Sequence, residues 1–276
     1  MRIIDGTEEI LEKILDKKDR IIYNLFYLIR EGDSAFFATD DSTYIIGQGN
    51  ESAPLWMWLK QIPDENVENE ICDIIKSRLV LNQYLQLNAY DKYARKILDR
   101  VSKKTGLGYC VSVPMIAYAC NQAISRYKIS GQIVTPKEEH KEIMARFITE
   151  FITEITYDTE KTAINESKAN GFANAMVNSN NLFLWEDDGK IVSMARIAHK
   201  TGEYARINTV FTEREQRGKG YAGMLVGKMS EKLLEENRIP MLYADARNPA
   251  SNAAYQKIGF VKYGEVTEYV FSENRC

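Results

Sequence analysis

The residues best suited to chemistry lie between positions 210 and 255. A glycine-rich run, Gly218-Lys219-Gly220, follows an apolar strand-like segment and opens a segment with helical spacing. Glycines let backbone N–H groups converge on one point, and the start of a helix adds positive potential there. Arg217 and Lys219 add positive charge. This combination predicts a site for a diphosphate, although the loop judged alone is also compatible with a plain solvated turn.

The same glycines match the dinucleotide-binding pattern, which gives a first alternative. Gly218, Gly220 and Gly223 fill G-x-G-x-x-G, and Asp245 lies near the end of the next predicted strand, where a ribose-binding acid is expected. However, the segment 212–217, in which four of six residues are charged, separates the strand from the first glycine. Only about 30 residues follow Asp245. These two features argue against a nicotinamide dinucleotide as the ligand of the glycine loop.

A second motif lies downstream of the glycine loop. It runs Asn248-Pro-Ala-Ser-Asn252-Ala-Ala-Tyr255-Gln-Lys-Ile-Gly259-Phe260. Together with Arg217-x-x-Gly220-x-Ala222, this segment resembles the GNAT acetyltransferase superfamily. The resemblance covers residues 131–271, and its specific motifs lie within 208–260. Ala222 stands where many members carry glycine, and both residues are small enough for close approach of a cofactor.

The resemblance implies that the chain binds acetyl-CoA as a co-substrate. Val210, Phe211 and Thr212 would end a splayed fourth strand, whose backbone pairs with the pantetheine arm. The diphosphate would be bound, mainly through backbone N–H groups, by Arg217, Gly218, Lys219, Gly220, Tyr221 and Ala222. Asn248 would donate or accept a hydrogen bond with pantetheine, and Asn252 would lie along the cofactor.

The resemblance also implies transfer of acetyl to a primary amine by direct attack in a ternary complex. Tyr255 would be the general acid for the departing thiolate, because a phenol of pKa ~10 is protonated at neutral pH. No metal and no covalent enzyme intermediate are needed. The proton acceptor for the amine stays open among Glu203, Glu213, Asp245 and a water relay. The acceptor amine is open too.

A purely structural role is the alternative for two of these residues. Tyr255 could be a core aromatic side chain of an amphipathic helix, and Asn248 could be only a turn residue beside a proline. A non-catalytic CoA-binding module that senses the cofactor is the main alternative to an enzyme.

The pattern of the chain predicts a mixed α/β fold around these residues. The C-terminal domain, residues 130–276, is expected to be a GNAT-type fold with a mixed, partly splayed sheet flanked by helices. Strands are expected at 182–185, 191–198, 204–212 and 240–246, and helices at 144–155, 161–177, 221–237 and 251–257. The smaller N-terminal domain, residues 1–129, is expected to be α/β and a degenerate relative of the same fold that lacks the glycine loop.

The composition of the chain further restricts the classes of protein and of binding partner to expect. The 276 residues are 45% hydrophobic and 27% charged, which excludes a disordered chain, and the net charge of −3 gives no reason to expect nucleic acid. Residues 105–125 carry no charge but contain glycine, proline and amides, so we expect a buried strand rather than a membrane span. The four cysteines form no C-x-x-C pair, which predicts reduced thiols and a cytoplasmic protein without a zinc site. The oligomeric state stays open.

Overall fold

The computed structural model describes residues 2–3, 9–33, 35–124, 129–155, 170–171, 174–176, 179 and 181–272. The chain divides into two compact units, each discontinuous in sequence. Unit 1 comprises residues 1–118, 243–249 and 262–276, and unit 2 comprises residues 119–242 and 250–261. The expected domains, 1–129 and 130–276, stay a prediction. The expected helix 161–177 lies mainly outside the described residues.

Unit 1 is an α/β unit with helices on both faces of a sheet. Its strands occur in the order β1-β2-β3-β4-β5-β12-β6. They are β1 (Arg2–Ile3), β2 (Phe36–Thr39), β3 (Tyr44–Gln48), β4 (Leu55–Leu59), β5 (Gln86–Ala89), β6 (Gly108–Ala119) and β12 (Val261–Ser272). The helices are α1 (Ile10–Ile14), α2 (Lys17–Ile22), α3 (Leu25–Arg30), α4 (Glu65–Leu81) and α5 (Asp91–Thr105).

Two apolar clusters hold unit 1 together, one against each group of helices. The first packs α4 and α5 on the sheet and includes Ile75, Leu98, Tyr269 and Phe271. The second packs α1–α3 on the sheet and includes Phe26. Most of these side chains are fully buried, and the burial of apolar surface is the main force that holds such layers together.

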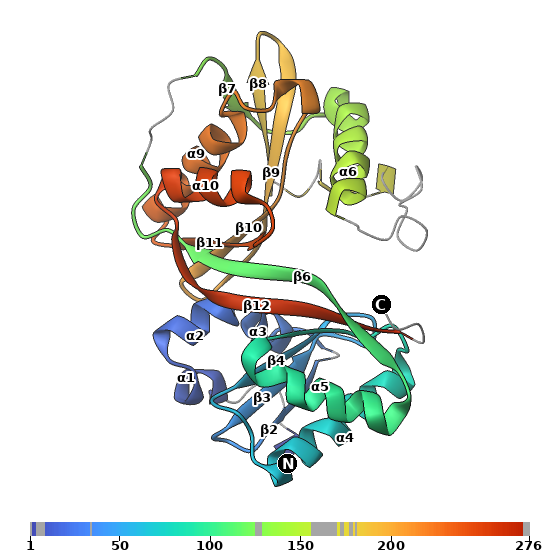
Figure 1. Cartoon of the computed structure of the whole chain (residues 1–276). Helices are drawn as coiled ribbons and strands as arrows, with labels where there is room; N and C mark the ends of the chain where they lie inside the picture. Colours follow the sequence, from blue (N-terminus) through green and yellow to red (C-terminus); the bar gives the residue numbers. More distant parts are fainter. Residues whose placement is uncertain are drawn as a thin grey trace. The chain divides into compact units, whose positions relative to one another are not determined.

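Unit 2 is a sheet covered by one long helix on each side of its centre. Its described elements are β7 (Gln132–Val134), η1 (Glu138–His140), α6 (Lys141–Ile155), β8 (Leu182–Asp187), β9 (Lys190–Thr201), β10 (Tyr204–Thr212), η2 (Arg214–Gln216), α9 (Tyr221–Glu235), β11 (Ile239–Asp245) and α10 (Pro249–Ile258). The strand order is β11-β10-β9-β8-β7. Helices α6 and α9 lie on opposite sides of β8–β10 (Figure 1).

The two halves of the chain repeat one order of elements. The first half runs β2-β3-β4-α4-β5-α5-β6, and the second runs β8-β9-β10-α9-β11-α10-β12. In each, the third strand pairs in parallel with the fourth, through Trp56↔Asn88 in the first half and Ala205↔Pro240 in the second. This repetition supports the expectation that the N-terminal part, which is also α/β, is related to the C-terminal fold.

Several local expectations agree with the structure and a few do not. The segment 17–30 forms two short helices, α2 and α3, which are separated at Tyr23 and Asn24. Residues 108–119 of the uncharged stretch form the strand β6, and no described helix is both long and apolar enough to cross a membrane. Cys72 and Cys120 are buried free thiols, but Cys110 is disulfide-bonded, so the expectation of reduced cysteines is wrong for Cys110.

Candidate active site

The strands β10 and β11 separate after a short paired segment. Their parallel register covers only residues 204–206 against 239–241, although β10 continues to Thr212. Over the described chain, no further register pair joins the two strands beyond Arg206. The backbone of residues 207–212 on that side is therefore placed where an extended ligand could pair with it, as a strand would.

A bulge shapes the end of β10 on its other side. The register with β9 shifts between Asn208 and Phe211, and Thr209 has φ +52°, an uncommon conformation for a residue other than glycine. Ser193, fully buried on β9, then fixes the strand end, because its hydroxyl donates to the Phe211 carbonyl at 2.7 Å. The Phe211 ring itself is buried against Phe147 of α6, with ring centroids 5.1 Å apart. Phe211 can therefore offer a ligand only its backbone.

The glycine loop has the backbone geometry expected of an anion site. Gly218 and Gly220 have φ +80° and +94°, in the left-handed region that favours glycine, and Gly220 is the N-cap of α9. Among the residues that the structure describes, no side chain caps this helix, and its first turn contains no acidic residue. Over the described residues, no N–H group from 218 to 222 donates to a turn, loop or cap carbonyl. These N–H groups and the positive end of the helix together make a cradle for an anion.

Helix α9 is held firmly behind this cradle. Leu225, Val226 and Leu233 are completely buried, as the helical spacing predicts. At its first residue, the Tyr221 hydroxyl donates to Asp187 Oδ2 at 2.5 Å, which ties the start of the helix to the end of β8. Hydrogen bonds from Ser130 and Tyr221 lower the pKa of the Asp187 carboxyl, so it is ionised at neutral pH.

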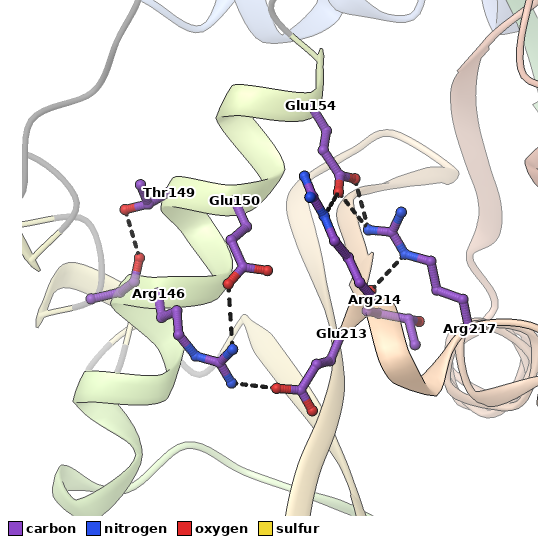
Figure 2. Close-up of polar contacts among 9 residues, drawn as sticks. Arg146, Thr149, Glu150, Glu154, Glu213, Arg214 and Arg217 are labelled. Carbon is purple, nitrogen blue, oxygen red and sulfur yellow. Dashed lines mark hydrogen bonds and ion pairs between the residues drawn. The ribbon is translucent and has the colours of Figure 1, made fainter.

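The side chain of Arg217 points toward α6 (Figure 2). Its Nη2 donates to both carboxylate oxygens of Glu154, at 2.8 and 2.7 Å, and its Nε donates to the Thr212 carbonyl at 3.0 Å. The guanidinium also lies over the Phe211 ring, 5.4 Å from its centroid. Arg214 Nε donates to the same carboxylate at 3.0 Å. We call this group, Glu154 with Arg214 and Arg217, the arginine clasp.

A cavity of about 280 Å³ lies between α6 and the loop that follows β10. It is lined by Arg146, Thr149, Glu150, Thr153, Glu213, Arg214 and Glu215. None of residues 217–222 lines it, so it is separate from the cradle. One of its arginines is already paired with two of its acids, because Arg146 contacts Glu150 at 3.3 Å and Glu213 at 2.5 Å (Figure 2). With three carboxylates and two guanidinium groups, this lining gives no preference for an anionic cofactor.

The downstream motif falls on α10 and the turn before it. Tyr255 is half-buried, its ring lies 5.9 Å from that of Phe260, and burial of its hydroxyl raises its pKa to about 12. Asn252, on the same helix, is buried. Asn248 is exposed and belongs to unit 1, where its N–H donates to the Asp245 carbonyl at 3.1 Å in a turn. The roles expected for these residues stay predictions.

The three acids considered as proton acceptors are differently placed. Glu203 lies in the turn before β10, at the opposite end of the strand from Thr212, and a strand rises ~3.3 Å per residue, so the two ends are roughly 26 Å apart. Glu213 is ion-paired with Arg146. Asp245, in unit 1, is ion-paired with Arg247 at 3.1 Å.

The structure also brings together residues that the sequence pattern does not single out. Arg196 and His199 on β9 lie opposite Asn208 and Arg206 on β10, so all four share one face of the sheet. Burial and the two positive neighbours lower the pKa of His199 to about 4, so its imidazole is neutral at pH 7. The sequence pattern does not single out Ser193 or Glu154 either. Strand and helix periodicity gives the face of a residue but not its partner from a distant segment.

Two further observations concern metal ligands and the helix of unit 1 that corresponds to α9. In the part of the chain that the structure describes, no group of three or more His, Cys, Asp or Glu residues could hold a metal ion. The helix α4, which occupies in unit 1 the place of α9, is capped by the Asp64 side chain through the N–H of Val67 at 3.0 Å, and Glu65 and Glu68 lie in its first turn. A carboxylate at that position repels an anion. Unit 1 therefore has no second anion cradle at α4.

Comparisons with known proteins agree with this geometry. The family model for the acetyltransferase (GNAT) family matches residues 145–260. No curated protein matches the chain. Among solved structures, a GNAT-family acetyltransferase from Colwellia psychrerythraea is 12% identical and aligns over 99% of this chain and 100% of its own, with a TM-score of 0.53.

Two other solved structures are similar over nearly the whole chain. A GCN5-related N-acetyltransferase from Kribbella flavida is 11% identical over 92% of this chain and 94% of its own, with a TM-score of 0.59. A Drosophila protein is 11% identical over 98% of this chain and 97% of its own, with a TM-score of 0.66. At these identities the likeness concerns the fold, and it extends over both halves.

The dinucleotide alternative does not agree with this arrangement. A doubly wound fold has parallel strands around its glycine loop, but β10 pairs antiparallel with β9. The splayed strand end, the uncapped glycine loop and the family match all fall on one segment. Residues 145–260, in the C-terminal half of the chain, therefore resemble an acetyltransferase domain of the GNAT family.

Proposed function

We propose that the chain transfers acetyl from acetyl-CoA to a primary amine, by direct attack within a ternary complex. The observation that carries the proposal is the uncapped, glycine-rich start of α9 beside the unpaired end of β10. The N–H groups of residues 218–222 bind the diphosphate, and the backbone of 207–212 pairs with the pantetheine arm. Arg217, which the sequence also predicts as part of the diphosphate site, contributes through its place at the start of this loop.

Tyr255 is the proposed general acid, and Asn248 and Asn252 are the proposed contacts of the pantetheine arm. The raised pKa of the Tyr255 phenol keeps it protonated at neutral pH, as a donor to the departing sulfur must be. The amine must lose a proton, since an unshifted alkylamine is mostly protonated at pH 7. The ion pairs of Glu213 and Asp245 support a water relay for this step.

Binding and turnover can be tested in one set of measurements. CoA is titrated calorimetrically into the protein, and release of free CoA is followed with acetyl-CoA and a panel of amines: polyamines, amino acids, peptides and aminoglycosides. Acetyl-CoA-dependent thiol release with at least one amine supports the proposal. Tight binding without turnover over the panel would instead support a CoA-sensing module, and absence of CoA binding would refute both.

The sensing alternative has one observation in its favour. Glu213 and Asp245, two of the acids considered as proton acceptors, are both engaged by arginines. A module that only binds CoA needs no such acceptor. The Tyr255→Phe variant distinguishes the two functions, because a sensor loses nothing measurable when the phenol oxygen is removed.

A further inference from the structure

The arginine clasp joins two segments that lie about 60 residues apart in the sequence. Glu154 is in the last turn of α6, and Arg214 and Arg217 are in the loop between β10 and the anion cradle. Both arginines bind the same carboxylate (Figure 2). The Glu154 side chain is 27% exposed and the Arg217 side chain 44% exposed, so this pairing is partly shielded from solvent.

The contacts of Arg217 fully specify the direction of its side chain. The guanidinium donates to Glu154 and to the Thr212 carbonyl and covers the Phe211 ring. The backbone N–H of Arg217 is also engaged, since it donates to the Arg214 carbonyl at 3.3 Å. A residue with these partners is fixed to the end of β10 and to α6. Gly218, the next residue, begins the left-handed turn of the cradle.

We propose that Glu154 is a positioning residue for the diphosphate site, and that the Arg217 side chain acts through this clasp rather than as a direct phosphate ligand. The inference rests on the proposed function, since it concerns the same loop. The clasp fixes the residue before Gly218 relative to β10. It thereby holds the N–H groups of 218–222 in the converging arrangement before the ligand arrives. A preorganised site binds its ligand more tightly because less loop entropy is lost.

Two other arrangements make different predictions. If Arg217 were a direct phosphate ligand, its removal would weaken CoA binding whether or not Glu154 were present. If Glu154 competed with the diphosphate for Arg217, removing the carboxylate would tighten CoA binding. In the positioning arrangement, either change breaks the same clasp. The second change then adds little to the first.

The test is a double-mutant cycle on CoA affinity. Glu154→Gln keeps the shape of the side chain and removes its charge. Arg217→Met removes the guanidinium and keeps an unbranched stem over Phe211. Each is measured alone and together by calorimetric titration with CoA, with thermal melting of each unliganded variant as the check of folding. Glu150→Gln, one turn earlier on α6 and paired with Arg146, is the matched control.

We expect each single variant to weaken CoA binding about tenfold, because a partly shielded charged hydrogen bond lies at the low end of its usual range. The double variant should be no more than about twofold weaker than either single. In turnover, both should raise KM for acetyl-CoA and leave kcat at saturation and KM for the amine unchanged. Glu150→Gln should bind CoA like the unmodified protein.

Three results would overturn the inference. They are an unchanged or tighter CoA affinity in Glu154→Gln, a roughly hundredfold loss in the double variant, and a loss in Glu150→Gln equal to that in Glu154→Gln. If Glu154→Gln does not fold, Arg214→Met replaces it in the cycle with Arg217→Met, since Arg214 binds the same carboxylate. Arg214→Met should then weaken CoA binding by itself and add no more than about twofold to the loss in Arg217→Met. Failure of the unmodified protein to bind CoA is a different result, which refutes the proposed function itself.

Discussion

Removing the hydroxyl of Tyr255 tests the chemical step most directly. Tyr255→Phe keeps the ring on α10 and its contact with Phe260, and removes only the group proposed to donate to the departing sulfur. We expect kcat to fall while CoA binding stays within about twofold. Tyr84→Phe, an exposed tyrosine of unit 1, is the matched control and should leave kcat unchanged.

The size of the effect follows from the pKa of the phenol. Burial raises the pKa of Tyr255 to about 12, whereas a thiol has a pKa of ~8.5. Complete transfer of the proton to the thiolate would therefore be uphill by roughly 5 kcal/mol. Tyr255 would act mainly as a hydrogen-bond donor to the developing negative charge. Such a bond contributes about 1.5–3 kcal/mol, so kcat should fall roughly 10- to 150-fold.

The assay is steady-state release of free CoA at saturating acetyl-CoA and amine, with the CoA dissociation constant measured separately. Because the phenol must be protonated and loses its proton only as the pH rises toward 12, kcat of the unmodified protein should have no descending limb from this group below about pH 10. A Tyr255→Phe variant with kcat within twofold of the unmodified protein would refute the donor role. An equal loss in CoA affinity and in kcat/KM, with kcat unchanged, would also refute the donor role.

Three further predictions concern the loop, the sheet and the core. Gly218→Ala and Gly189→Ala each place a methyl group in open space at positive φ, so each should lower the free energy of unfolding by ~1–2 kcal/mol in denaturant titrations, but only Gly218→Ala should weaken CoA binding; equal effects on CoA would contradict the cradle. His199, which faces Arg196 and Arg206, has a folded pKa of about 4 against 6.5, so it binds a proton more readily when unfolded. The contribution of His199 to the free energy of unfolding should be constant above about pH 6.5 and fall by roughly 3 kcal/mol as the pH drops to 4. The His199→Asn variant should lose less unfolding free energy over this pH range, and an identical pH dependence would exclude His199 as its source. Phe211→Ala should cost ~3–5 kcal/mol in unfolding free energy, since the ring is 3% exposed and packs on Phe147, and a loss below 1 kcal/mol would mean that the core refills the space.

Local features of the fold could be read from the sequence because they depend on near neighbours. Alternating side chains predict the strand at 204–212, which the structure confirms with the same bounds. Helical spacing and two glycines predict α9 and its start within a residue or two. Trp56 and Trp58, in the continuous apolar run 55–59, belong to the buried strand β4. Each of these depends on residues within about one turn or one strand.

Features that depend on distant partners could not be read in this way. The carboxylate of Glu154 pairs with a loop about 60 residues later, and nothing in the spacing of either segment points to the other. The separation of β10 from β11 is a property of register, which periodicity does not encode. Tyr255 could be placed on a helix from its neighbours, but the desolvation that raises its pKa comes from the folded surroundings.

The pairing of β12 with β5 has a consequence for how the molecule is made. Tyr269 and Phe271 complete the cluster that packs α4 and α5, so β5 lacks this neighbour until the ribosome has synthesised residues 262–272. Until then β5 is an unprotected edge beside an incomplete interior, a state prone to association with other nascent chains. A recombinant fragment ending at residue 129 would keep that edge permanently, and we expect it to precipitate unless a peptide carrying residues 262–272 is supplied in trans.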